Sequence, residues 1–219
     1  MAQDLFRKFQ AMPAVGGRGP APPASSERIP RHSTGLGEFT RMLAGQEEMR
    51  ILDLGPTSPT NIARLTGLGH KMYNEDILLA STAPAYAVRT EEGRPGIDVD
   101  RFLLENLTYT TTLFDAVLCW DIPDYLPEAV VRPVVERLHR VTKPGGVLLA
   151  FFHTRDAGPD APYYRYHIVG DDELELQQGP RFRLQRIFNN RNIEKLFQEF
   201  ASIKFFLARD NVREVLVVK

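Results

Sequence analysis

Residues 114–152 read FDAVLCWDIPDYLPEAVVRPVVERLHRVTKPGGVLLAFF, and this stretch decides the fold. It holds two apolar runs of buried-strand length, 114–120 and 146–153, around a segment with apolar residues at helical spacing. That spacing predicts a helix up to residue 141, either kinked at Pro133 or beginning there, because proline interrupts a helix interior. KPGG at 143–146 should end the helix. Two buried strands joined by a helix indicate a parallel sheet covered by helices.

The alternation continues outward from this stretch. RILDLG at 50–55 is typical of a buried strand, Ser58 and Pro59 of a helix start, and HKMYNE at 70–75 of a weaker strand. Short helices are expected over 35–43 and around 99–103. A further helix is expected after Asn190, whose side chain can cap it. Between 77 and 109 no third parallel strand is evident. Residues 163–188 alternate with a period of two, which predicts an antiparallel meander, and SIKFFLA (202–208) and VREVLVV (212–218) predict a closing hairpin. The predicted fold class is α/β, a doubly wound, mostly parallel sheet that ends in an antiparallel β-hairpin and carries a small antiparallel insertion at about 160–188.

Composition indicates one domain and excludes several classes. Residues 12–30 hold five Pro and three Gly, so we expect a flexible segment over 1–33 and a single α/β domain over 34–219. With 27 basic and 28 acidic side chains among 219 residues, a globally basic nucleic-acid binder is excluded. No apolar run is long enough to span a bilayer, and the start does not resemble a signal peptide. The single Cys119 excludes an internal disulfide, and no metal site is predicted from Cys/His spacing, so we expect a cytoplasmic protein.

In a doubly wound sheet, ligands bind beyond the carboxyl ends of the strands. The candidate segments are therefore 53–58, 75–76, 119–125 and 153–155. The tyrosines around them either line a substrate pocket or cover the sheet; these are Tyr125, Tyr163, Tyr164 and Tyr166.

Four segments resemble the class I S-adenosylmethionine-dependent methyltransferases: ILDLG at 51–55, an acidic residue at 75 or 76, residues 114–127 and RVTKPGGVLLAFF at 140–152. The resemblance covers roughly residues 50–219 apart from the meander. It implies S-adenosyl-L-methionine as cofactor, with Glu75 or Asp76 accepting hydrogen bonds from the ribose hydroxyls. The cofactor-binding residues that it implies are Asp53, Gly55, Pro56, Thr57, Glu75, Asp76, Cys119, Trp120 and Asp121.

The resemblance implies a methyltransferase acting on a small-molecule acceptor. Methyl transfer needs alignment and exclusion of water, and a base only where the acceptor must lose a proton, so the catalytic residue stays open among His153, Asp121 and Tyr125. Asp121 and Asp124 have the plainer alternative of capping a helix. Protein partners and homo-oligomers stay open, whereas specific nucleic-acid binding and membrane binding are not expected.

The alternative function is a non-catalytic, methyltransferase-like interaction protein. It rests on the turn GPTSPT at 55–60, which keeps only Gly55 where that family usually has several glycines. A nicotinamide-dependent oxidoreductase is disfavoured, because no G-x-G-x-x-G follows the first strand of the alternation.

Overall fold

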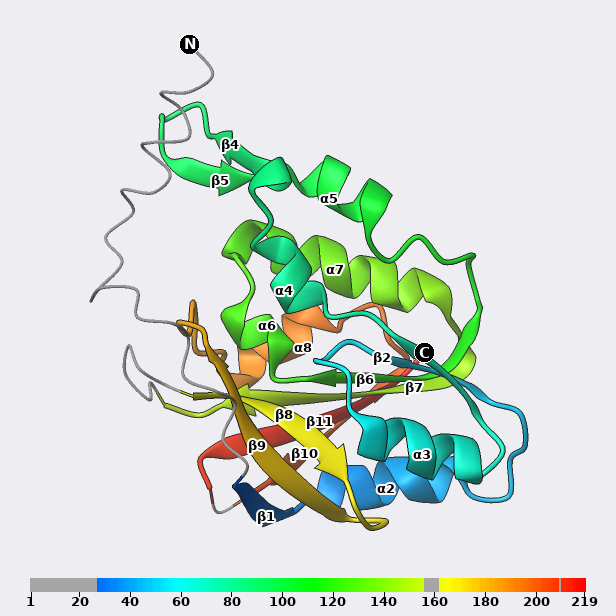
Figure 1. Ribbon diagram of the computed structural model, residues 1–219. Coiled ribbons are helices and arrows are strands. Elements are labelled where there is room, and N and C mark those ends of the chain that lie inside the picture. The colour runs from blue at the N-terminus through cyan, green and yellow to red at the C-terminus, as the bar shows by residue number, and fades with distance from the viewer. Residues whose placement is uncertain (1–26, 156–161, 209) are drawn as a thin grey trace.

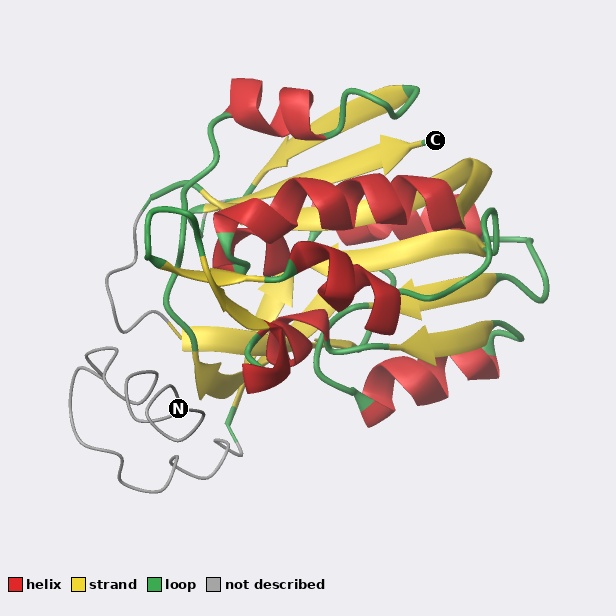
Figure 2. Ribbon diagram, turned by 90° about the horizontal axis from the view of Figure 1, so that it is seen from above, coloured by secondary structure: helices red, strands yellow, loops and turns green. Residues whose placement is uncertain are grey.

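A computed structural model describes residues 27–155, 162–208 and 210–219. Its main sheet runs parallel in the middle and ends in an antiparallel hairpin (Figures 1 and 2). The strand order is β10 (Ser202–Leu207), β11 (Val212–Val218), β7 (Thr142–His153), β6 (Phe114–Trp120), β2 (Arg50–Asp53) and β3 (Lys71–Asn74). The predicted fold class is confirmed. The sheet stops at β3, and the described residues between β3 and β6 add no further strand to it.

Helices cover both faces of the main sheet (Figure 1). On one face lie α2 (Thr34–Leu43) and α3 (Pro59–Gly67); on the other lie α4 (Ile77–Ser81), α5 (Val99–Glu105), α6 (Ile122–Tyr125), α7 (Glu128–Val141) and α8 (Asn190–Leu196). The hydroxyl of Ser58 accepts the N–H of Asn61 at 3.1 Å, and Pro59 follows in the first turn, so α3 begins where the sequence predicts. Each face has its own buried apolar cluster, and the two clusters divide the side chains of β6 and β7 between them.

A second, three-stranded sheet packs on the α2–α3 side, in the order β1 (Arg28–His32), β9 (Glu173–Arg181), β8 (Pro162–Ile168). The prediction of a flexible segment through residue 33 is wrong for β1, which pairs along its whole length with β9. Residues 1–26 of that segment lie outside the described residues. The antiparallel meander predicted over residues 163–188 is confirmed for β8 and β9 and wrong beyond them: residues 182–189 are irregular, and β1 takes the place beside β9.

Helix α7 begins at Glu128 and includes Pro133, so of the two predicted alternatives the helix beginning at Pro133 is wrong. A second boundary in the deciding stretch also differs from the prediction. Strand β7 already begins at Thr142, so KPGG lies within it, and the register with β6 shifts between Phe114 and Ala116. Likewise, Asn189 rather than Asn190 caps α8, accepting the N–H of Asn192 at 2.9 Å.

The stretch without an obvious strand forms a small antiparallel pair, β4 (Ala87–Arg89) with β5 (Pro95–Ile97), after a single 3₁₀ turn at Pro84–Tyr86. In the parts of the chain that the structure describes, no helix is long and apolar enough to cross a membrane. The same residues contain no group of three or more His, Cys, Asp or Glu side chains that could hold a metal ion.

Candidate functional site

The site begins with Asp53 at the carboxyl end of β2. Its carboxylate is 2% exposed and accepts three hydrogen bonds. Oδ1 accepts the backbone N–H of Gly55 at 3.0 Å and Nε1–H of Trp120 at 2.7 Å, and Oδ2 accepts from Nδ2 of Asn61 at 3.0 Å. Burial raises the pKa of Asp53, and these donors oppose the rise. Asp53 therefore holds the loop after β2, the end of β6 and the start of α3 together.

Trp120 lies against Gly55. A Cβ added to Gly55 would come within 2.9 Å of Cδ1 of the indole, so only glycine fits there without movement. The indole is 2% exposed and stacks on Tyr166 from β8, with ring centroids 4.9 Å apart and planes 7° from parallel. Its backbone has φ of +52°, which is uncommon outside glycine. This conformation places the ring between β2 and β8, where it closes the approach to Gly55 from that side.

Strand β8 is fastened over this end of the sheet by Asn61. Nδ2 of Asn61 donates to the carbonyl of Tyr166 at 3.0 Å, and Oδ1 accepts the N–H of Ile168 at 2.7 Å. A second tie joins Ser58 to Nδ1 of His167 at 2.8 Å. Neither Asn61 nor His167 is among the residues predicted from the sequence. The available signal was an asparagine inside a helix, where its side chain usually competes with the backbone.

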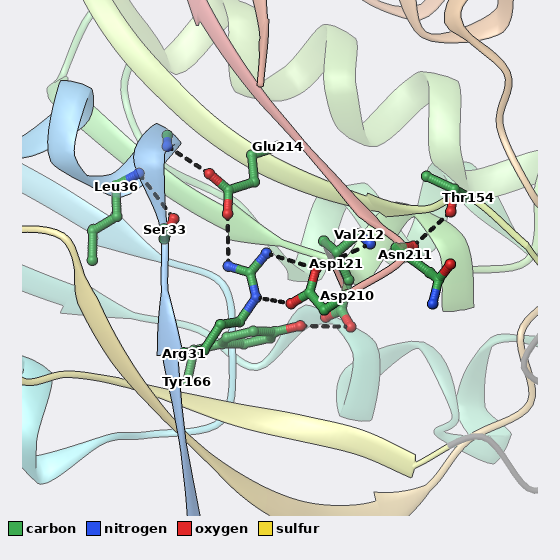
Figure 3. Close-up of polar contacts among 11 residues, drawn as sticks. Arg31, Ser33, Leu36, Asp121, Thr154, Tyr166, Asp210, Asn211, Val212 and Glu214 are labelled. Carbon is green, nitrogen blue, oxygen red and sulfur yellow. Dashed lines mark hydrogen bonds and ion pairs between the residues drawn. The ribbon is translucent and has the colours of Figure 1, made fainter. Parts of the chain in front are cut away.

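Asp121 follows Trp120 and is fully buried. Oδ2 accepts the hydroxyl of Tyr166 at 2.9 Å, as Figure 3 shows. Oδ1 has no hydrogen-bond partner, and neither has the buried hydroxyl of Tyr163. Burial raises the pKa of Asp121 to about 6, against the opposing effect of nearby His153. Buried polar atoms without partners are rare, so these two indicate a position for a polar ligand or for water.

The two acidic residues after β3 have different surroundings. Oε1 of Glu75 accepts the N–H of Leu107 at 2.7 Å, toward the α5 side. Oδ1 of Asp76 caps α4 by accepting the N–H of Leu79 at 3.0 Å. Asp76 is close enough to Asp53 for its charge to raise the pKa of that carboxyl. Of the two residues, Asp76 is thus the one brought toward the Asp53 end of the site.

The remaining expected cofactor residues do not all gather at that point. Pro56 is half-buried, and the hydroxyl of the exposed Thr57 donates to the side chain of Asn74. Cys119 is buried in the apolar cluster on the face opposite Trp120, because successive side chains of a strand alternate. Burial raises the pKa of the Cys119 thiol.

His153 and Asp124 pair at the carboxyl end of β7. Oδ2 of Asp124 lies 2.8 Å from Nδ1 of His153 and also accepts the backbone N–H of His153 at 2.6 Å. The ring of Tyr125 stands edge-on to the imidazole and to Tyr163, with centroids 5.8 and 5.2 Å apart. All three catalytic candidates, His153, Asp121 and Tyr125, therefore lie in one neighbourhood. From the sequence, Asp124 is predicted only as a possible helix cap.

A charged network from β1 holds the three-stranded sheet against the hairpin (Figure 3). The guanidinium of Arg31 pairs with Glu214 at 2.7 Å and with Asp210 at 2.5 Å, and lies 5.0 Å from the ring centroid of Phe151. Glu214 also accepts the N–H of Gly35. Since Arg31 and Glu214 are 6% and 1% exposed, this is a buried ion pair that fixes β1 in place.

No family model and no curated protein matches the sequence. Among solved structures, 1,6-didemethyltoxoflavin-N1-methyltransferase from Burkholderia thailandensis is similar at 10% identity and a TM-score of 0.47, over 85% of this chain and 79% of that one. A SAM-dependent methyltransferase from Aquifex aeolicus has 14% identity and a TM-score of 0.44, over 83% and 88%. A possible exported protein from Bordetella parapertussis has 16% identity and a TM-score of 0.45, over 100% and 79%.

Proposed function

We propose that this protein is a methyltransferase that uses S-adenosyl-L-methionine and acts on a small-molecule acceptor. The observation that carries the proposal is the set of acceptor oxygens at the carboxyl ends of β2, β3 and β6. Oδ1 of Asp121 is buried without a partner, and Asp76 uses only Oδ1 within the described contacts. Three of the four sequence segments that resemble class I methyltransferases include or follow these strand termini, namely residues 51–55 at β2, residue 75 or 76 after β3 and residues 114–127 at β6.

The donor groups of S-adenosylmethionine suit these oxygens. Its ribose carries two hydroxyl donors and its methionine part an ammonium, and a carboxylate accepts from either. Asp76 would hold the ribose, and Asp121 with the hydroxyl of Tyr163 would hold the polar groups near the end of β6. When bound, the cofactor supplies an electrophilic methyl group on a sulfonium.

The residues of the chain then have three tasks. Asp53 fixes the loop that carries Gly55, Tyr166 orients Asp121 through its hydroxyl, and strand β8 covers this end of the sheet and excludes water. Exclusion of water favours a small acceptor that can be enclosed. The unpaired Cys119 supports a reducing compartment, and we propose the cytoplasm.

A second candidate, a non-catalytic interaction protein of the same fold, is favoured by one observation. The indole of Trp120 lies against Gly55, and all three donors that reach Asp53 come from the protein itself. If Trp120 never leaves this position, the backbone of Gly55 stays out of a ligand's reach.

The only tryptophan of the chain provides the test. S-adenosylmethionine and S-adenosylhomocysteine are titrated into the full chain, with calorimetry and Trp120 emission as readouts and adenosine as control ligand. The proposal predicts binding heat together with a change in emission, and a loss of both in Asp121→Asn but not in the surface control Asp171→Asn. Absence of heat and of any emission change at millimolar ligand would leave the second candidate.

Methyl transfer is tested separately. The protein is incubated with S-adenosylmethionine labelled at the methyl group and a panel of small phenols, amines and thiols. Transfer of label to any of them supports the small-molecule acceptor. Binding of the cofactor without transfer to any class of acceptor would contradict it.

A further inference from the structure

The imidazole of His153 is held by a buried carboxylate. Asp124 is fully buried, and one of its oxygens, Oδ2, contacts both the backbone N–H and Nδ1 of His153. A carboxylate beside Nδ1 keeps the proton on that nitrogen and leaves the lone pair on Nε2. No described residue forms a hydrogen bond with Nε2, and 15% of the His153 side chain is exposed. The ring is thus fixed in orientation with its basic nitrogen available.

A series of side-chain interactions links the His153 ring to the proposed methyl site. Trp120 stacks on Tyr166, the hydroxyl of Tyr166 donates to Asp121, and the charge of Asp121 acts on His153. The ring stacking and the hydrogen bond, together with the charge of Asp121, link the Gly55 loop to the imidazole along the carboxyl ends of β2, β6 and β7. His153 therefore lies on the side of the sheet where the acceptor would meet the methyl group.

Charged groups from several elements surround the ring. Asp121 lies between β6 and α6, Asp124 lies in α6, Asp210 comes from the turn between β10 and β11, and Arg213 from β11 acts on Asp124. Burial alone would lower the pKa of His153, but the hydrogen bond to Asp124 and the charges of Asp121, Asp124 and Asp210 outweigh it and hold the pKa above 6.5. The neutral imidazole, which can accept a proton, accumulates as the pH rises through the pKa of His153.

We propose that His153 is the general base that removes a proton from the methyl acceptor, and that Asp124 is the residue that positions it. This inference rests on the proposed methyltransferase function. The acceptor is then a molecule whose nucleophile carries a proton that must leave, an O–H or N–H group. Its proton passes to Nε2, its electron pair forms the bond to the methyl carbon, and the pair of the broken S–C bond stays on sulfur, which leaves as a neutral thioether. The imidazolium returns its proton to water.

The first test uses diethyl pyrocarbonate, which modifies neutral imidazole, on the full chain, with peptide mass spectrometry to separate the five histidines. The modification rate of His153 should have its midpoint above pH 6.5 in the parent protein. In Asp124→Asn the midpoint should move down by about one pH unit, because a stabilising charge is lost. S-adenosylhomocysteine, together with an accepted phenol or amine where one is found, should slow modification of His153 and leave His139 unaffected.

The second test measures methyl transfer to phenols and amines. His153→Gln should lower turnover by about 10²- to 10⁴-fold, the usual contribution of a general base, without weakening S-adenosylhomocysteine binding. His139→Gln is the matched control, since His139 lies on α7 against Phe200, away from the site. If Asp124 positions His153, the midpoint of the pH–rate profile should move in Asp124→Asn. If Asp124 has only a structural role, the midpoint should stay where it is in the parent protein.

The outcomes separate this inference from the proposed function. If S-adenosylhomocysteine binds but fails to shield His153, or if His153→Gln transfers methyl groups at the parental rate, the general base is refuted and the methyltransferase stands. If neither cofactor nor product binds, both fall. Circular dichroism shows whether Asp124→Asn folds. If it does not, the inference is still tested in the parent protein by the pH midpoint of His153 modification and by the protection of His153 on ligand binding.

Discussion

Replacing Asn61 by alanine should loosen the attachment of strand β8 over the site. The side chain of Asn61 is 1% exposed and makes three hydrogen bonds, two from Nδ2 to Asp53 and Tyr166 at 3.0 Å and one from Ile168 to Oδ1 at 2.7 Å. Asn61→Ala removes all three at once. It leaves a buried carboxylate oxygen, a carbonyl and an N–H without their partner.

The expected cost follows from the groups left behind. Each buried polar group that loses its partner costs about 1–3 kcal/mol, more when charged. The three groups are neighbours, and water entering the vacated space would serve more than one of them. We therefore expect a loss of about 3–5 kcal/mol in the free energy of unfolding rather than the full sum, a large part of the stability of an ordinary domain.

Two measurements check the Asn61 prediction. Urea unfolding followed by Trp120 emission and by circular dichroism gives the change in stability, with Asn192→Ala as control. Asn192 makes one long contact to the N–H of Asn189, at 3.4 Å, so its replacement should cost less than about 1 kcal/mol. Amide hydrogen exchange then localises the effect, and the N–H of Ile168 should exchange much faster in Asn61→Ala. Equal stability losses in the two variants, or unchanged exchange at Ile168, would refute the reasoning.

Three further changes have definite expected outcomes. Gly55→Ala should destabilise by about 1–3 kcal/mol, because the new Cβ would lie 2.9 Å from the Trp120 ring; urea unfolding measures this loss. Arg31→Met should cost about 3–5 kcal/mol in urea unfolding, since it leaves Glu214 charged and 1% exposed, whereas Met replacing both partners together should cost much less. Because the pKa of Asp121 is raised from 3.8 to about 6, its stabilising contribution is complete below about pH 4 and is lost as the pH rises to about 6. Asp121→Asn should therefore flatten the decline in stability over this range, as thermal melts at each pH would reveal.

The main sheet could be predicted because its signals are local. The apolar runs of β2, β6 and β7 are long enough to require burial on both faces, and the alternation in β10 and β11 fits a hairpin. Strand β1 carries no such signal. It is short, contains two arginines and Pro30, and its partner β9 lies about 145 residues away in the chain. An edge strand of this composition depends on tertiary pairing, which a window of sequence does not contain.

Only the last segment of the predicted meander, from residue 182 onward, is wrong, and for a related reason. Residues 182–189 alternate as a strand would, but the free edge of β9 is already occupied by β1. Leu184 and Phe188 are instead buried in the cluster on the α7 side. An alternation with a period of two shows that successive side chains face opposite ways. It does not show which strand or cluster those side chains pack against.

In the site, sequence position alone brought Asp53, Gly55, Trp120 and Asp121 into the right neighbourhood, since they follow two adjacent strands. It could not place the indole of Trp120, because neither the positive φ nor the stacking on Tyr166 is visible in the sequence. The role of Asp124 depends on His153 from the next strand, and that pairing is likewise set by the fold.

Trp120 also reconciles the two candidate functions in energetic terms. Moving the indole away from Gly55 breaks its hydrogen bond to the Asp53 carboxylate, worth about 1.5–3 kcal/mol, and its stacking on Tyr166, worth about 0.5–1.5 kcal/mol. A ligand that needs the open position would therefore bind about 30- to 2000-fold more weakly than the open site alone allows, for a cost of about 2–4.5 kcal/mol. Such a cost is small enough for a cofactor with several hydrogen-bonding groups to overcome, and large enough to exclude fragments such as adenosine. The closed position of the indole therefore does not by itself favour the non-catalytic alternative over the proposed methyltransferase.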